Sequence, residues 1–192
     1  VEVWKEHICH KFLTLTELSI LRRCHTFFEK YWRNMMTQNT IRVPQGCLTV
    51  EKAMALAMIF SERKEYTTDN PLKIQLEEGV HDIVGALDNK VLDVTCSHIT
   101  FVGKGKDRTT MHGGVSVCNQ QNVKFEELAV MNQRGYGLQL WGSETIVNVL
   151  KCAFKECRRT GMVVAGGATV TATQCEFVEN DESGVHCQYA NT

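Results

Sequence analysis

The sequence has almost no net charge, because 21 lysines and arginines are balanced by 22 aspartates and glutamates among its 192 residues. The formal charge of −1 and the pI near 6.7 give no long-range field that would attract nucleic acid or an anionic membrane. We therefore expect neither nucleic acid nor a membrane surface among the partners of this protein.

Long hydrophobic runs are also missing. The longest fully apolar stretch is AMALAMIF, at 53–60, and it is far shorter than the roughly 20 residues that span a bilayer. The opening residues VEVWKEH do not have the pattern of a secretory signal peptide. The nine cysteines are an odd number, and a chain of this size does not need disulfides to fold. We expect reduced thiols and an intracellular protein, cytoplasmic or nuclear.

Nucleotide-binding motifs are absent, although ITFVGKGKDRTTMHGG, at 99–114, superficially resembles one. A P-loop has the pattern G-x-x-x-x-G-K-[ST], whereas here Thr100 replaces the first glycine and Asp107 follows Lys106. The dinucleotide pattern G-x-G-x-x-G fails at Arg108. We expect no cofactor, and we interpret this stretch as a corner between strands whose basic side chains are solvated.

A repeat is present in the second half of the sequence. Four glycines recur at intervals of 23, 24 and 23 residues, and each precedes a short segment with apolar ends: Gly114 (VSV), Gly137 (LQL), Gly161 (MVV) and Gly184 (VHC). Short strands with this period predict a parallel β-helix whose coils stack about 4.8 Å apart. The glycines are expected to mark corners, where a positive φ is accessible without strain.

The repeat assigns side chains to the inside or the outside of the coils. We expect two inward ladders, one of Val117, Leu140, Val164 and Cys187 and one of Leu128, Cys152 and Cys175, and we expect Phe154 and Phe177 to stack inward one coil apart. The outward residues of the first strand in each coil are Ser116, Gln139, Val163 and His186. Because these four residues include no carboxylate, they predict a binding face without an acid–base pair, and no catalytic residue is expected.

The chain from Ile41 to its end resembles the right-handed parallel β-helix superfamily, which includes pectate lyases and other carbohydrate-binding or carbohydrate-cleaving proteins. The resemblance rests on the repeat, on KIQLEEGVHDI, HITFVGKG and TTMHGG, and on the helical face of LTVEKAMALAMIF formed by Ala53, Leu56, Ala57 and Phe60. It implies a mainly β domain at 41–192, with an N-terminal cap helix at about 49–61 and coils from about 72. The sequence stops at YANT, just after the strand expected at 185–187, so we expect further coils beyond Thr192.

Residues 1–40 are expected to form a separate helical segment. TLTELSILRRCHTFFEKYWRNMM begins with a capping box of Thr14 and Glu17 and continues with an apolar stripe. The segment resembles the F-box, which binds the adaptor subunit of cullin-type ubiquitin ligases, at Ile8, Phe12, Leu13, the run LTELSILRRC and Trp32. The resemblance implies that Ile8, Leu13, Leu18 and Leu21 bind the adaptor. The alternative is a helical appendage that packs on the β-helix.

A metal site is not expected. His7, Cys9, His10, Cys24 and His25 are candidate ligands for zinc. However, adjacent residues on a helix point about 100° apart, so Cys24 and His25 cannot both reach one ion.

Together these features predict a non-enzymatic interaction protein that is monomeric apart from its partners. In this hypothesis the helical segment binds a ligase adaptor and the β-helix presents its surface to a protein substrate. The alternative is a carbohydrate-binding or polysaccharide-cleaving β-helix whose active face lies in coils beyond Thr192.

Overall fold

The computed structural model describes residues 37–84 and 90–188. The chain divides between Thr40 and Ile41 into two units, and nearly all of the described residues belong to the second. The segment that resembles an F-box lies outside the described residues.

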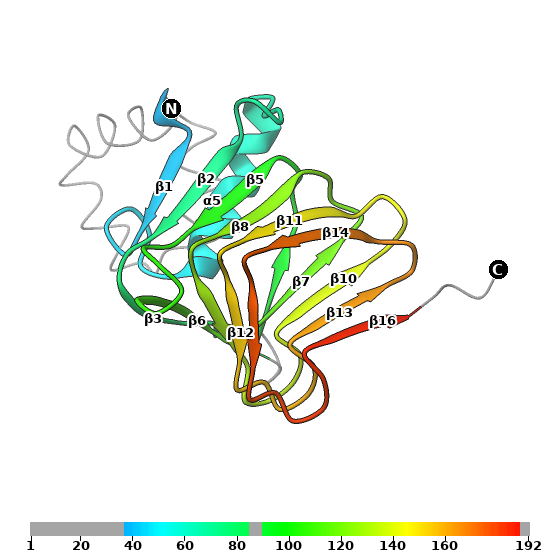
Figure 1. The fold of residues 1–192 in the computed structure, drawn as a ribbon. Helices are drawn as coiled ribbons and strands as arrows, with labels where there is room; N and C mark the ends of the chain where they lie inside the picture. The colour runs from blue at the N-terminus through cyan, green and yellow to red at the C-terminus, as the bar shows by residue number, and fades with distance from the viewer. Residues whose placement is uncertain (1–36, 85–89, 189–192) are drawn as a thin grey trace. The chain divides into compact units, whose positions relative to one another are not determined.

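The second unit is a mainly β solenoid of about five turns, and each turn contributes one strand to each of three sheets (Figure 1). Sheet A contains β1 (Thr40–Val43), β2 (Leu72–Leu76), β5 (Ile99–Val102), β8 (Val123–Glu126), β11 (Ile146–Leu150) and β14 (Thr169–Thr173). Sheet B contains β3 (Gly79–Asp82), β6 (Thr109–His112), β9 (Ala129–Met131), β12 (Ala153–Lys155) and β15 (Glu176–Val178). Sheet C contains β4 (Val91–Val94), β7 (Gly114–Cys118), β10 (Leu138–Trp141), β13 (Met162–Ala165) and β16 (Val185–Gln188).

Successive turns pair in parallel and in register, so equivalent residues lie on top of one another. In sheet C the register aligns Val117, Leu140, Val164 and Cys187, which confirms the first predicted ladder. Val117 and Leu140 are fully buried, whereas Val164 is half-buried and Cys187 is exposed. Burial falls in this direction because β16 pairs with β13 alone among the described strands, so the last inward side chains have no turn above them.

Stacked phenylalanines fill the interior beneath sheets A and B. The Phe154 and Phe177 rings are 5.3 Å apart with an interplanar angle of 14°, which confirms the predicted stacking. The Phe101 and Phe125 rings stack in the same way at 5.1 Å. In-register pairing places identical side chains one strand spacing apart, and aromatic rings can then stack and contribute more than their buried area.

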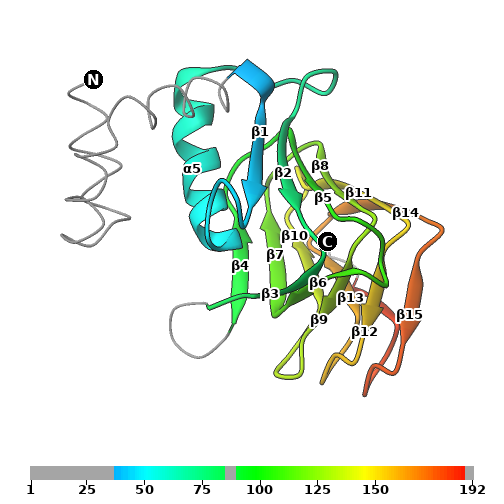
Figure 2. The same cartoon turned by 90° about the vertical axis from the view of Figure 1, so that its left-hand side faces the viewer.

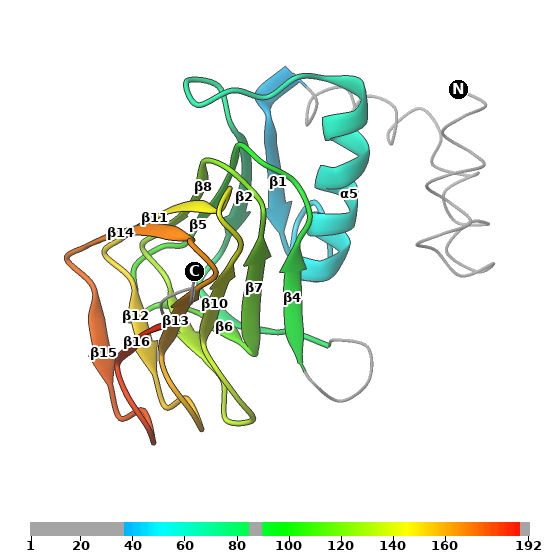
Figure 3. The ribbon, with the colours of Figure 1, turned by 90° about the vertical axis from the view of Figure 1, so that its right-hand side faces the viewer.

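The predicted helix is α5 (Val50–Arg63). The Thr49 side chain caps its N-terminus by accepting a hydrogen bond from the Lys52 N–H at 3.3 Å. The predicted apolar face is confirmed, because Ala53, Leu56, Ala57 and Phe60 are all buried. The helix contacts β2 and β4 and lies beside β1 (Figures 2 and 3).

The repeated glycines lie where the strands of sheet C begin, as predicted, but they do not have the predicted backbone conformation. None of Gly114, Gly137, Gly161 and Gly184 has a positive φ. At Gly114, Gly137 and Gly161 a side chain would collide with the next turn: a Cβ on Gly161 would lie 2.8 Å from Gly184 O and 2.9 Å from Asn180 Nδ2. A Cβ on Gly184 would instead lie 2.8 Å from the Phe177 Cβ of its own turn. The positive φ values at the corners belong largely to other residues, among them Asn122 (54°), Glu127 (53°), Lys151 (52°), Glu156 (53°), Gln174 (54°) and Glu179 (55°).

We predict that Gly161→Ala lowers the free energy of unfolding by about 1–3 kcal/mol, the usual cost of overpacking. Gly135→Ala is the matched control, because its Cβ would meet only Asn132 Nδ2, at 3.4 Å, and we expect it to be nearly neutral. Chemical denaturation of both variants measures the difference. Equal stability of the two variants would contradict the steric role of Gly161.

Phe154 is fully buried, and we predict that Phe154→Ala costs about 3–5 kcal/mol through the cavity that it leaves. Phe177 is half-buried in the last turn, so Phe177→Ala should cost less. Urea denaturation of the two variants measures both losses. A loss under about 1 kcal/mol for Phe154→Ala would mean that the side chain does not lie in the core.

Candidate functional site

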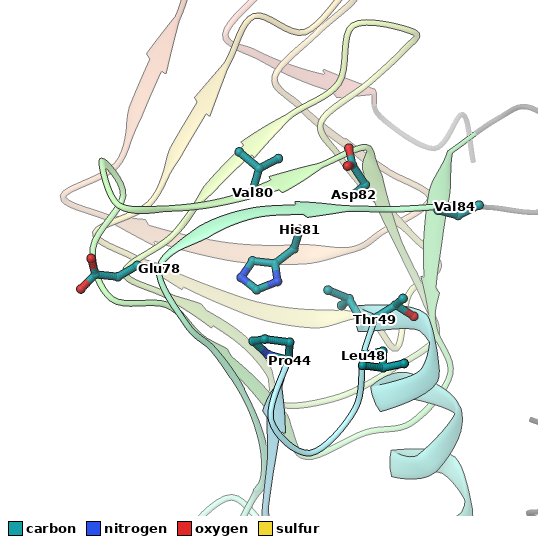
Figure 4. Close-up of a pocket in the computed structure, with 9 residues that line it drawn as sticks. Pro44, Leu48, Thr49, Glu78, Val80, His81, Asp82 and Val84 are labelled. Atoms are coloured by element: carbon teal, nitrogen blue, oxygen red, sulfur yellow. The ribbon is translucent and has the colours of Figure 1, made fainter. Parts of the chain in front are cut away.

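A groove of about 330 Å³ lies between β3 and the segment that joins β1 to α5. The His81 ring points from β3 toward Pro44, whereas Val80 and Asp82 point to the opposite side of the strand (Figure 4). Exposed apolar residues also line the groove, because Leu48 and Val84 expose 69% and 73% of their surface. This end of the solenoid therefore offers a partly apolar surface.

His81 occupies an inward position at the start of a ladder. It pairs in register with Met111 of β6, which is fully buried. His81 Nε2 lies 2.8 Å from the carbonyl oxygen of Glu77, so the ring is held by its own turn. The first residue of this inward row is therefore the polar His81 ring, which also lines the groove.

Glu51 in the first turn of α5 lies at the end of β3. One carboxylate oxygen accepts a hydrogen bond from the Val84 N–H, and the other is buried without a hydrogen-bond partner among the described residues. A carboxylate near a helix N-terminus is favoured by the helix dipole. Glu51 thus provides a hydrogen-bond acceptor for the Val84 N–H, which lies two residues beyond the end of β3.

An acid–histidine pair lies on the outer face of sheet B. His112 of β6 and Asp82 of β3 are register partners, and His112 Nδ1 lies 2.7 Å from Asp82 Oδ1. The same outward row continues through Met131 to Lys155. A carboxylate in this position orients an imidazole for proton transfer. This pair was not among the expected site residues. The two positions are 30 residues apart, whereas the repeated glycines that defined the repeat are 23 or 24 residues apart.

The expected outer face does form one row on sheet C. The register aligns Ser116, Gln139, Val163 and His186, and it adds Asp93 of β4 at the start of the row. Ser116 and Gln139 are half-buried and His186 is exposed, but Val163 exposes only 5% of its surface between the longer Gln139 and His186 side chains. Trp141, two residues after Gln139 on the same face, is 39% exposed.

The predicted corner at 103–108 is present, since β5 ends at Val102 and β6 begins at Thr109. Its basic side chains, however, are paired with acids rather than simply solvated. Lys104 Nζ lies 3.8 Å from Glu77 Oε2, and Arg108 forms an ion pair with Glu78. These partners lie on the preceding turn, so the loop's positive charge is neutralised locally.

Lys106 reaches further than the other loop residues. Its ammonium lies 2.9 Å from Glu176 Oε2 on β15, and this hydrogen bond raises the pKa of Lys106. Ala129 and Ala153 occupy the outward row between Thr110 and Glu176, yet they are 0% and 4% exposed. We infer that the lysine stem lies across these two small residues and covers them.

The described residues contain no group of three or more His, Cys, Asp or Glu side chains that could hold a metal ion. The candidate ligands His7, Cys9, His10, Cys24 and His25 lie outside the described part of the chain. Burial raises the pKa of the Cys47 thiol to about 11 and that of Cys96 to about 12. These thiols are protonated near neutral pH, whereas a cysteine binds a metal ion as the thiolate.

The expected adaptor-binding residues, Ile8, Leu13, Leu18 and Leu21, also lie outside the described residues. Their role stays a prediction. Across 37–84 and 90–188, no helix is long and apolar enough to cross a membrane.

Comparison with known proteins identifies the family. The family model described as "Right handed beta helix region" matches residues 81–192, which are more than half of the chain. No curated protein and no solved structure matches the chain. The matched segment contains most of the stacked turns described above. The chain therefore belongs to the right-handed β-helix family.

Proposed function

We propose that this protein is a non-enzymatic interaction scaffold, and that it acts as the substrate-recognition subunit of a cullin-type ubiquitin ligase. The observation that carries the scaffold role is the outer row of sheet C. Its carboxylate, Asp93, and its histidine, His186, are separated by four strand spacings, or about 19 Å. That distance is too long for one acid–base pair to act on a single bond.

The composition of this face suits a protein partner. It presents uncharged polar groups from Ser116 and Gln139 and an aromatic surface from Trp141. Aromatic residues are enriched in protein–protein interfaces, where charged residues are depleted at the centre. Stacked repeats also provide long, regular surfaces for extended partners.

The ligase role comes from the helical segment at 1–40, through its resemblance to the F-box. We propose that Ile8, Leu13, Leu18 and Leu21 contact the adaptor and that the protein works inside the cell, where such ligases act. In this proposal the protein is monomeric apart from the adaptor and the substrate.

We further propose that α5 caps the N-terminal end of the solenoid, in the manner of the pectate-lyase-like superfamily. Its buried face contacts β2 and β4 of the first turn. A cover of this kind protects the first turn from adding a further strand.

The adaptor contact predicts that Leu18→Asp abolishes co-purification of the full chain with the ligase adaptor, because a charge would be buried in the complex without a partner. Ser19→Asp is the matched control, because it introduces the same charge at the neighbouring residue, which is not part of the apolar stripe. This variant should retain binding. The circular dichroism of the β-sheets should be unchanged in both variants. Failure of the unmutated chain to bind the adaptor would overturn the ligase role. Unfolding of the Leu18→Asp variant would also count against it, because Leu18 would then be needed for folding rather than for binding.

One observation favours a second candidate, a carbohydrate-binding or polysaccharide-cleaving protein. The His112–Asp82 pair provides an oriented base, and Lys155 lies two strands away in the same row. Elimination from a uronate polymer requires a base and a cation near the carboxylate. The two positions are about 10 Å apart by strand spacing, and the long lysine side chain can shorten that gap toward a single uronate residue.

A polyuronate assay separates the two candidates. Under the scaffold proposal, the protein leaves polygalacturonate intact, and no unsaturated product absorbing in the ultraviolet accumulates. Cleavage that disappears in His112→Gln but persists in the control Lys124→Gln, which lies on the outer face of sheet A, would establish the enzyme instead.

A further inference from the structure

Cys152 and Cys175 lie at the same position of successive turns. Each immediately precedes a strand of sheet B, and the next residues, Ala153 and Glu176, are register partners. The Glu176 N–H donates a hydrogen bond to the Cys152 carbonyl oxygen at 2.9 Å. Neighbouring strands are about 4.8 Å apart, which lies within the Cα separation that a disulfide bridges.

The two thiols point into the same small region. Cys152 Sγ donates to the Leu150 carbonyl oxygen at 3.3 Å, and Cys175 Sγ contacts the adjacent Val149 carbonyl oxygen at 3.6 Å. Both acceptors belong to the end of β11. Cys175 Sγ also donates to the Thr173 carbonyl oxygen of its own turn at 3.4 Å, as Cys152 Sγ does to Leu150, and Leu150 and Thr173 are register partners. The two thiols therefore hold equivalent positions one turn apart.

The two cysteines differ in their access to solvent. Cys152 is fully buried, and burial, with a smaller contribution from the neighbouring Cys175, raises the pKa of its thiol to about 12. Cys175 is half-buried at the corner of the last described turn. A reagent in solution consequently meets Cys175 first.

The described residues contain no other pair of cysteines in equivalent positions. Cys118 is aligned with Trp141, and Cys187 is aligned with Val164. Cys152 and Cys157 flank β12 on either side, so a strand separates them.

We propose that Cys152 and Cys175 are a redox-sensitive pair that forms a disulfide by exchange with a small-molecule disulfide such as oxidised glutathione. The Cys175 thiolate attacks one sulfur of the reagent, forms a mixed disulfide and releases one glutathione thiolate. Cys152 Sγ then attacks the Cys175 sulfur while its proton passes to the departing glutathione sulfur, which forms the Sγ–Sγ bond and releases the second glutathione as a thiol. Two cysteine thiols are oxidised, and one glutathione disulfide is reduced to two thiols.

The resulting link joins two neighbouring turns. In-register side chains stand about one strand spacing apart, slightly more than the Cβ separation of a relaxed disulfide. The turns must therefore move together a little, and such a bond is readily reduced again. The pair is suited to reversible oxidation rather than to permanent crosslinking.

The experiment treats the full chain with oxidised glutathione under native conditions, then blocks free thiols and maps the peptides by mass spectrometry. We expect one linked pair of peptides containing Cys152 and Cys175, with a mass lower by two hydrogens and with two fewer titratable thiols. Excess dithiol should restore both thiols. Slower amide exchange in β14 and β15 should accompany the link, because it ties the last turn to its neighbour.

Three variants identify the order of the steps. Cys152→Ala should retain a stable glutathione adduct on Cys175, whereas Cys175→Ala should leave Cys152 unmodified. Cys118→Ala, at an exposed cysteine, should form the link like the unmutated chain. A persistent adduct on Cys175 without a link in the unmutated protein, or no adduct in folded Cys152→Ala, would overturn the proposal.

Discussion

Parallel pairing between successive turns is the interaction on which the rest of the structure depends. In-register pairing puts each residue directly above a residue in the same environment, so an apolar side chain at one level requires an apolar side chain at the next. The ladder that contains Val117 and Leu140 and the stacked rings of Phe154 and Phe177 follow from this requirement. So do Gly114, Gly137 and Gly161 at the start of the repeat, where the next turn leaves no space for a side chain.

The inward side of the solenoid was largely predictable from the sequence, because a periodic fold repeats its in–out alternation in every turn. Phe154 and Phe177 could be paired from spacing alone, as could the buried face of α5 from its helical periodicity. The role of Gly161 could not, because its neighbours Gly184 and Asn180 belong to the next turn and the clash exists only in three dimensions. Corner conformations were also missed, since the left-handed backbone falls on residues such as Glu127 and Lys151 rather than on the repeated glycines.

The candidate site was less predictable than the core. The outer row of sheet C was found from the repeat, but the near-complete burial of Val163 depends on the size of its neighbours. The His112–Asp82 pair escaped because the turn between them is longer than the others, which hides their common register. Each residue is the last of a four-residue strand, β3 or β6.

The contact of Lys106 with Glu176 has a mechanical consequence. Contacts in a solenoid normally join adjacent turns, so bending can be distributed among independent steps. This lysine instead joins the loop before β6 to β15, three strand positions along sheet B, on one side of the stack. If the solenoid bends so that this side becomes longer, the ion pair between Lys106 and Glu176 is stretched. If it bends the other way, the pair is not stretched. An exposed ion pair contributes little free energy, so it favours one direction of bending by a small amount.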